Sequence, residues 1–286
     1  MNPIVIVLPI LLLLMFGLGL SFRPGEWLAL IRQPKAVWVG LAAQMLVLPL
    51  LALGLVWWFR PEPYVWVGLM LIAASPGGSS SNILTLLAKG DVPLSVTLTV
   101  LSSVLTVFTL PPLLAFSLQT AGLGQGAAID LPVGQLLLQN GVLVLLPMLL
   151  GMVFNHRYPQ AAKRVGRWID KAAFPALLLL ATVFFVANRQ LIASHFSSLV
   201  LMVSLLIAAA MAAGALLAGV FGLQGRQRRT IVIEAGIQNS AQAIAVAGSP
   251  FVLNNAAFAV PAVIYALLMN VILLGYIAYY RFGRKA

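Results

Sequence analysis

The sequence predicts an all-α polytopic membrane protein, and three observations lead to this fold class. Hydrophobic residues make up 62% of the 286 residues and charged residues only 8%, whereas a soluble domain has about 25% charged residues. Apolar runs of about 20 residues, the length that crosses a bilayer core, recur along the whole chain. Cysteine is absent, which excludes disulfides, thiolate metal sites and a thiol nucleophile.

Nine transmembrane helices are expected from the apolar runs. They cover residues 3–21, 36–58, 64–89, 92–118, 133–155, 170–187, 196–221, 228–250 and 254–280. The first run has neither the basic leader nor the small-residue cleavage site of a signal peptide, so we interpret it as a spanning helix.

Basic residues divide unevenly between the two sets of loops. Fifteen lie on one side: Arg23, Arg32, Lys35, Lys89, Arg157, Lys163, Arg164, Arg167, Lys171, Arg226, Arg228, Arg229, Arg281, Arg284 and Lys285. The other side holds two, Arg60 and Arg189. The positive-inside rule then predicts an inner-membrane protein with its N-terminus outside and its C-terminus in the cytoplasm. Loops that face anionic lipid explain the net charge of +11, so no nucleic-acid partner is expected.

Two of the nine spans are interrupted by residues that break helices. The third contains SPGGSSSN, in which Pro76, Gly77 and Gly78 disfavour helix at mid-depth and the following serines are candidate caps of a second half-helix. The eighth contains EAGIQNS, with polar residues from 234 to 240 inside an apolar run. Irregular backbone at membrane depth occurs only where it is buried in protein or lines a cavity.

The positions of the two breaks indicate inverted repeats. Spans one to four and spans six to nine run in opposite senses, and the interrupted span is third in each set. Paired interrupted segments are the best sequence pointer to the binding site of a transporter. The order and polarity of the spans carry this prediction, since the identity between the two halves is weak.

Glu234 is the one acidic residue that falls inside an apolar run. A charge at mid-bilayer costs roughly 2.5–3.5 kcal/mol on insertion scales, and no Lys or Arg lies at a similar depth to pair with it. Either Glu234 binds a cation, or it is protonated and hydrogen-bonded between helices.

Oxygen-bearing side chains at comparable depth favour the cation. Gln44, Ser81, Asn82, Ser95, Thr99, Gln238 and Asn239 offer the hard donors that sodium prefers, and carbonyls near Ala235 and Ile237 could add to them. Ser95 and Thr99 are four residues apart and share one helix face. The starts of the second half-helices, with Ser79, Ser80, Asn239 and Ser240, could receive a carboxylate. Ser102, Ser103 and Ser204 are interpreted as serines that bond to their own helix backbone or aid packing.

The motifs SPGGSSSN, LAKGDVPLSVTLT and EAGIQNS together resemble the bile acid:sodium symporter family, and the likeness extends from FGLGLSFRP to the region of Asn270. The resemblance implies a core domain that is formed by residues of about 36–118 and 196–280 and contains two crossing broken helices. A panel domain at about 3–21, 133–155 and 170–187 would lie beside it.

The resemblance also implies two sodium ions and no organic cofactor. Ser81, Asn82, Ser95, Thr99 and Glu234 would hold the first ion. The second would take Gln44, Glu234 and Gln238 with the backbone of Ala235 and Ile237. Substrate would lie between core and panel, near Ser79, Ser80, Asn239, Ser240 and Asn270. The expected cargo is a small organic anion, either a pantoate-like or other carboxylate or a bile acid, and no obligatory protein partner is evident.

Two other function classes are alternatives to symport. In a proton-coupled or sodium-independent transporter of organic anions or metalloids, Glu234 would carry the proton. An intramembrane enzyme is disfavoured, because His156 and His195 both lie near span ends and no second acid accompanies Glu234.

Overall fold

The computed structural model describes residues 4–22, 32–123, 133–187, 189–249 and 252–282. Three of the basic loop residues, Arg23, Arg284 and Lys285, lie outside these residues, and so does the expected end of the eighth span. Every named element in the described residues is helical.

The helices follow one another along the chain with short π-helical (η2, η3) and 3₁₀ (η4) segments. They are α1 (Ile4–Ser21), α3 (Pro34–Ala42), η2 (Ala43–Val47), α4 (Leu48–Phe59), α5 (Pro63–Ala73), α6 (Ser81–Leu87), α7 (Val92–Thr120), α8 (Val133–Asn140), η3 (Gly141–Leu145), α9 (Leu146–Arg157), α10 (Pro159–Ala187), α11 (Arg189–Val220), α12 (Gly225–Gly236), α13 (Ser240–Gly248), η4 (Ala256–Ala259) and α14 (Val260–Phe282).

The described helices fit a polytopic membrane protein. Five stretches are long and apolar enough to cross a bilayer: Pro34–Phe59, Val92–Thr120, Val133–Arg157, Phe196–Val220 and Ala256–Tyr280. Leu8–Ser21 and Pro63–Ala73 are shorter apolar helices. Large apolar side chains such as Trp38, Leu50 and Leu216 are exposed on the helix surfaces, as a lipid environment requires. The expected total of nine spans stays a prediction, because each half of an interrupted helix is too short to span alone.

Each π-helical segment precedes a Leu–Pro pair, Leu48–Pro49 after η2 and Leu146–Pro147 after η3. Proline has no backbone N–H, and its ring collides with the carbonyl four residues earlier. The wider turn gives that ring room, and such π-bulges are frequent at functional sites. The bulge in η2 contains Gln44, whose side chain is buried.

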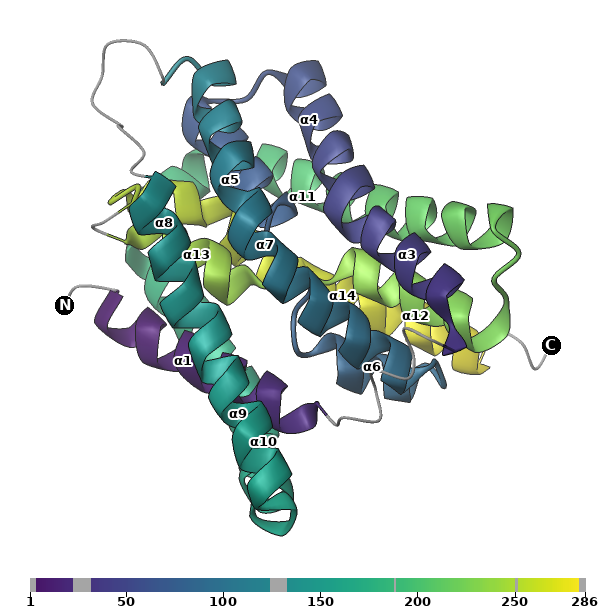
Figure 1. Cartoon of the computed structure of the whole chain (residues 1–286). Coiled ribbons are helices and arrows are strands. Elements are labelled where there is room, and N and C mark those ends of the chain that lie inside the picture. Colours follow the sequence, from purple (N-terminus) through teal and green to yellow (C-terminus); the bar gives the residue numbers. More distant parts are fainter. Residues whose placement is uncertain (1–3, 23–31, 124–132, 188, 250–251, 283–286) are drawn as a thin grey trace.

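Helices distant in sequence pack against one another. The purple α1 lies against the teal α9 and α10 in Figure 1, and α12 contacts α11, α3, α6 and α7. Glycine allows the closest of these approaches: a Cβ built on Gly151 of α9 would lie 3.0 Å from Gly19 Cα of α1. Small residues of this kind let membrane helices approach backbone to backbone.

The two breaks predicted from the sequence meet in space. The backbones of Gly77 and Gln238 form an antiparallel bridge, and the Asn239 N–H donates to the carbonyl of Pro76 at 2.8 Å. A Cβ on Gly78 would lie 2.9 Å from a methyl carbon of Ile237, so the crossing requires glycine there. These contacts confirm both predicted breaks.

The expected serine caps are wrong for the first broken helix. Ser80 occupies the cap position of α6, but its side chain makes no capping hydrogen bond. At the second break, Asn239 caps α13 by accepting a hydrogen bond from the Gln242 N–H at 3.0 Å. The hydroxyls after the first break are therefore not required for capping, and Ser81 turns toward other side chains.

Asp91 holds the start of α7 against α12. Its carboxylate accepts from the Leu94 N–H at 3.1 Å and from Gln33 Nε2 at 3.0 Å. Its own N–H donates to Thr230 Oγ1 at 2.7 Å. Because Ser95 lies one turn into α7 and Glu234 one turn beyond Thr230, these bonds fix the register of the two helices that carry the candidate site.

Candidate cation site and cavity

Glu234 lies in the last turn of α12 and is fully buried. Its Oε1 accepts a hydrogen bond from Ser95 Oγ, and Thr99 Oγ1 lies 3.4 Å from Oε1 and 3.2 Å from Oε2. Gln44 Nε2 donates to Oε2 at 3.0 Å. The other two described carboxylates whose side chains are placed, Glu62 and Asp91, lie at helix starts, so the expectation of one acid at depth is met in this part of the chain.

The cluster around Glu234 contains more oxygen contacts than protons to serve them. Ser81, Ser95 and Thr99 supply three hydroxyl protons, whereas seven O–O contacts connect them with one another, with Asn82 Oδ1, with the Ser95 carbonyl and with the carboxylate. One proton serves one acceptor at full strength, so several lone pairs have no donor. A cation among them would satisfy several of these oxygens at once, and hard oxygens suit sodium.

A second group of oxygens lies beside the first. Gln44 Nε2 donates to the Glu234 carbonyl at 2.8 Å, and Gln238 Nε2 approaches the Ala235 carbonyl at 3.4 Å. The amide oxygens of both glutamines are buried without a hydrogen-bond partner. Ile237 is extended, which ends the helix and frees backbone groups here. A buried acceptor without a donor is costly, and a bound cation would offset that cost.

Both predicted ligand sets are thus brought together by the fold. Ser81, Asn82, Ser95, Thr99 and Glu234 are linked by direct contacts. In the second set, Gln44 contacts the same carboxylate, and Gln238 approaches the carbonyl of the neighbouring Ala235. The Ile237 N–H lies 3.4 Å from the Glu234 backbone carbonyl. Within the described residues no group of three His, Cys, Asp or Glu side chains could hold a metal ion. One carboxylate among neutral oxygens is a donor set suited to an alkali cation.

Ser102 and Gly77 also belong to this site, in roles that the sequence alone did not predict. The Ser102 hydroxyl accepts from the Gly77 N–H at 3.1 Å and donates to the Thr99 carbonyl at 3.1 Å, so it fastens the first break to α7. A Cβ on Gly77 would lie 3.0 Å from Gln44 Nε2 and 3.1 Å from Glu234 Oε2. The spacing of Ser95, Thr99 and Ser102 places all three on one helix face, and this pattern could have indicated that Ser102 belongs to the site.

A cavity of about 840 Å³ adjoins the cluster. It lies between α1, α9 and α10 on one side and α6 and α7 on the other, and its apolar wall includes Leu14, Leu18, Ile83, Val96 and Ile169. Asn82 lines this cavity and also contacts Ser95, so one side chain joins the cavity to the oxygen cluster. The volume is in the range of cavities that hold small organic molecules.

The predicted substrate residues divide into two groups. Ser79 lines the cavity, together with the basic side chains of His156, Lys163 and Arg167. Asn239 and Ser240 are buried at the second break, and the side-chain amide of Asn270 donates to the Ala266 carbonyl at 2.8 Å within α14. Ser80, Asn239, Ser240 and Asn270 are not part of the cavity wall in this conformation.

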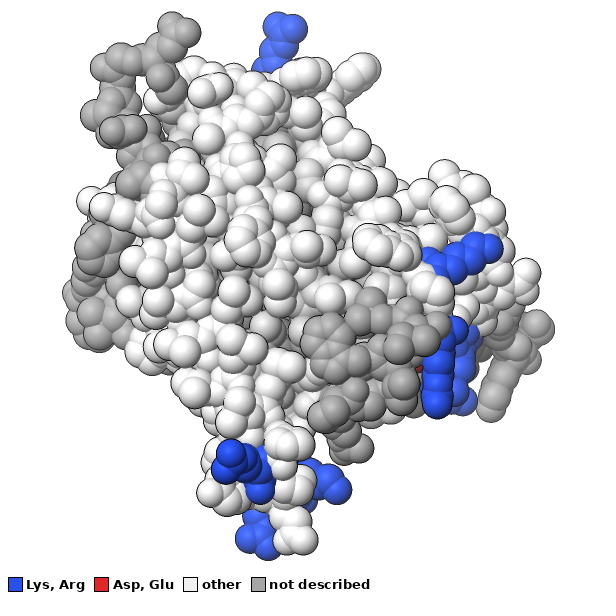
Figure 2. All heavy atoms as spheres, in the orientation of Figure 1, with Lys and Arg blue, Asp and Glu red and all other residues white. Residues whose placement is uncertain are grey.

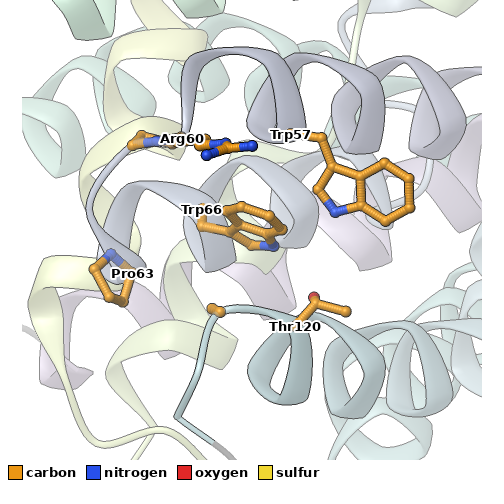
Figure 3. A pocket seen from close by; sticks show the side chains of 7 residues that line it. Trp57, Arg60, Pro63, Trp66 and Thr120 are labelled. Carbon is orange, nitrogen blue, oxygen red and sulfur yellow. The ribbon is translucent and has the colours of Figure 1, made fainter.

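A smaller cavity of about 460 Å³ lies where α4 ends, α5 begins and α7 ends. Figure 3 shows the indoles of Trp57 and Trp66 with Arg60 and Thr120 around it. It shares no residue with the oxygen cluster. Its two tryptophans and one arginine are typical of a membrane interface.

Comparison with known proteins decides the family. The profile of the sodium bile acid symporter family matches residues 8–195. The chain belongs to this family. It is 30% identical over 284 residues to the human ileal sodium/bile acid cotransporter. The aligned region covers 96% of this chain and 79% of the human protein. Family membership supports sodium-coupled transport by a multi-pass membrane protein and is consistent with a non-enzymatic role.

Bacterial and plant members also resemble the chain. An uncharacterized sodium-dependent transporter of Bacillus subtilis, YocS, is 27% identical over 260 residues, 90% of this chain and 77% of that protein. A probable chloroplastic sodium/metabolite cotransporter of Arabidopsis thaliana, BASS1, is 29% identical over 258 residues, 90% of this chain. The chain spans 62% of the Arabidopsis protein's length.

Proposed function

We propose that this protein couples the entry of sodium to the symport of a small organic anion by alternating access. The observation that carries the proposal is the oxygen cluster around Glu234, in which three hydroxyl protons serve seven contacts at the crossing of two broken helices. The family name and the sodium-dependent relatives support the choice of sodium as the cation.

Two ions are proposed, one in each oxygen group. The first would be held by Ser81, Asn82, Ser95, Thr99 and Glu234, and the second by Gln44, Gln238, the same carboxylate and the backbone of Ala235 and Ile237. Two buried amide oxygens without a donor support the second site. Two sodium ions that share one carboxylate leave a net positive charge at the site, and this charge favours an anionic substrate nearby.

The substrate is proposed to occupy the cavity between α1, α9 and α10 and the broken helix α5–α6. Ser79 and Asn82 would meet its polar end, and the apolar wall would cover its hydrocarbon part. Lys163 and Arg167 on the cavity wall would attract an anion electrostatically. A small carboxylate fits these features, and the name of the ileal relative makes bile acids candidates as well.

The transport movement is proposed to separate a panel from a core. The panel would be α1, the α8–α9 helix and α10, and the core the helices around the two breaks. We place the N-terminus outside and the C-terminus in the cytoplasm, on the positive-inside rule. In Figure 2 most of the visible blue Lys and Arg side chains lie at the lower tip and along the right-hand edge, and one lies at the top.

Uptake into proteoliposomes tests the proposal. Labelled pantoate, pyruvate and taurocholate are offered with an inward sodium gradient, with potassium in its place, and with a proton gradient alone. We expect sodium to stimulate uptake of at least one anion, and Glu234→Gln to abolish the stimulation. The control is Glu62→Gln, which removes an exposed carboxylate. Uptake driven by the proton gradient and indifferent to sodium would instead identify the proton-coupled alternative.

A further inference from the structure

A third cavity, of about 380 Å³, lies apart from the transport site at the turn between α11 and α12. It is lined by Gly219, Leu223, Gln224, Gly225, Arg228, Arg229 and Tyr280. The arginines and Tyr280 come from α12 and α14, so the cavity is a basic pocket between helices. No Asp or Glu is among its lining residues.

The positions of the two arginines differ in a way that suits an anion. Arg229 is fixed: one of its Nη atoms donates to the Lys89 carbonyl at 2.7 Å, and its guanidinium lies 5.8 Å from the Tyr280 ring centroid. Its Nε is buried and has no hydrogen-bond partner. Arg228 is exposed beside it. The pocket thus contains one preorganised donor and one adaptable charge, neither neutralised by a carboxylate on its wall.

The surroundings of the pocket are lipid-facing. Leu216 and Val220 are strongly exposed and lie on the same face of α11 as Gly219, at helical spacing. Tyr279, beside Tyr280 on α14, is exposed as well. The two arginines therefore lie next to an exposed apolar strip. This combination suits an amphiphile, which has a charged group and a hydrocarbon part, better than it suits a free anion. Basic pockets between transmembrane helices on the cytoplasmic side bind anionic headgroups in other proteins.

We propose that Arg228, Arg229 and Tyr280 bind the phosphate of an anionic membrane lipid whose acyl chains lie along Leu216 and Val220. The bound lipid joins the start of α12 to α14 and, through Arg229, to the α6–α7 turn. Since α12 carries Glu234 at its other end, the lipid stabilises the helices that position the candidate cation site. Lipid binding here requires neither sodium nor a transported anion.

Native mass spectrometry and thermal unfolding of the purified full chain test the assignment. The probes are phosphatidylglycerol, phosphatidylcholine and inorganic phosphate, each added to delipidated protein. We expect phosphatidylglycerol to remain bound and to raise the melting temperature. We expect phosphatidylcholine to do so far less, and inorganic phosphate to have no effect. Equal stabilisation by phosphatidylcholine, or full stabilisation by inorganic phosphate, would overturn the proposal.

Three variants locate the site. Arg228→Gln should weaken phosphatidylglycerol binding on the order of fivefold, since one basic residue near a lipid surface contributes about 1 kcal/mol. Gly219→Leu should also weaken it although both arginines remain, because Gly219 lines the pocket and a larger side chain there, unopposed by any neighbour within 4 Å of its Cβ, would take up space that the lipid needs. Arg164→Gln, which removes an exposed arginine outside the pocket, is the matched control. Equal losses in Arg228→Gln and Arg164→Gln, or full binding in Gly219→Leu, would mean diffuse attraction instead.

Discussion

Replacing Gly77 by alanine tests whether the crossing of the breaks forms the cation site. The added methyl carbon would lie 3.0 Å from Gln44 Nε2 and 3.1 Å from Glu234 Oε2, closer than ordinary contacts. Both atoms belong to proposed ligand residues, and neither has room to move freely because both are buried. Overpacking of a tight interior costs about 1–3 kcal/mol. If that cost opposes ion binding, sodium affinity falls roughly 5- to 150-fold.

The assay is the rise in melting temperature with sodium concentration, because a ligand that binds the folded state raises its stability. Potassium at equal ionic strength corrects for general salt effects. Gly54→Ala is the control, since Gly54 lies in α4 and an added Cβ would have no neighbour within 4 Å. Unchanged sodium dependence in Gly77→Ala would refute the reasoning. An equal loss in Gly54→Ala would show that the assay does not report on the site.

Two further predictions concern single contacts. Ser95→Ala should weaken sodium binding by about 10-fold or more, because it removes one proposed oxygen ligand, and a polar contact with a charged group contributes about 1.5–3 kcal/mol. Ser103→Ala should leave the sodium titration unchanged, because the Ser103 hydroxyl donates to the Thr99 carbonyl of its own helix at 2.7 Å. Gly151→Val should lower the melting temperature by separating α1 from α9, whereas Gly134→Ala, in open space, should not. Normal stability of Gly151→Val would contradict the close packing.

The features that sequence reasoning predicted best are those that a bilayer makes costly. A carboxylate inside an apolar run, and proline and glycine at mid-depth, are tolerated only for a structural or functional reason. Glu234 and the two breaks were therefore visible without a structure, and both breaks are confirmed. Ser95 and Thr99 were found because their spacing places them on one face, and both contact the carboxylate.

The contacts that sequence reasoning missed depend on backbone geometry across the breaks. Ser102 does bond to the backbone of its own helix, as expected, but its second contact was not predicted, because the partner, the Gly77 N–H, is free only where the first helix unwinds. Ser80 does not cap α6 for the same reason, because the backbone path through the break decides which hydroxyl can reach the free N–H groups at the start of the helix. The pairing of Gly77 with Gln238 joins positions far apart in the chain, and no local pattern specifies it.

Asn82 gives the arrangement a physical route for coupling ion and substrate. Its side chain lines the cavity and lies 2.9 Å from the Ser95 hydroxyl, whose single proton is also within reach of Glu234. When the Ser95 proton goes to the carboxylate, the Asn82 oxygen loses its donor, and a cation beside it restores a partner. We infer that sodium binding fixes the orientation of the Asn82 amide, and thereby which polar groups the cavity presents to an anion. An anion that contacts Asn82 would then bind more tightly with sodium present, and by linkage sodium would bind more tightly with the anion present.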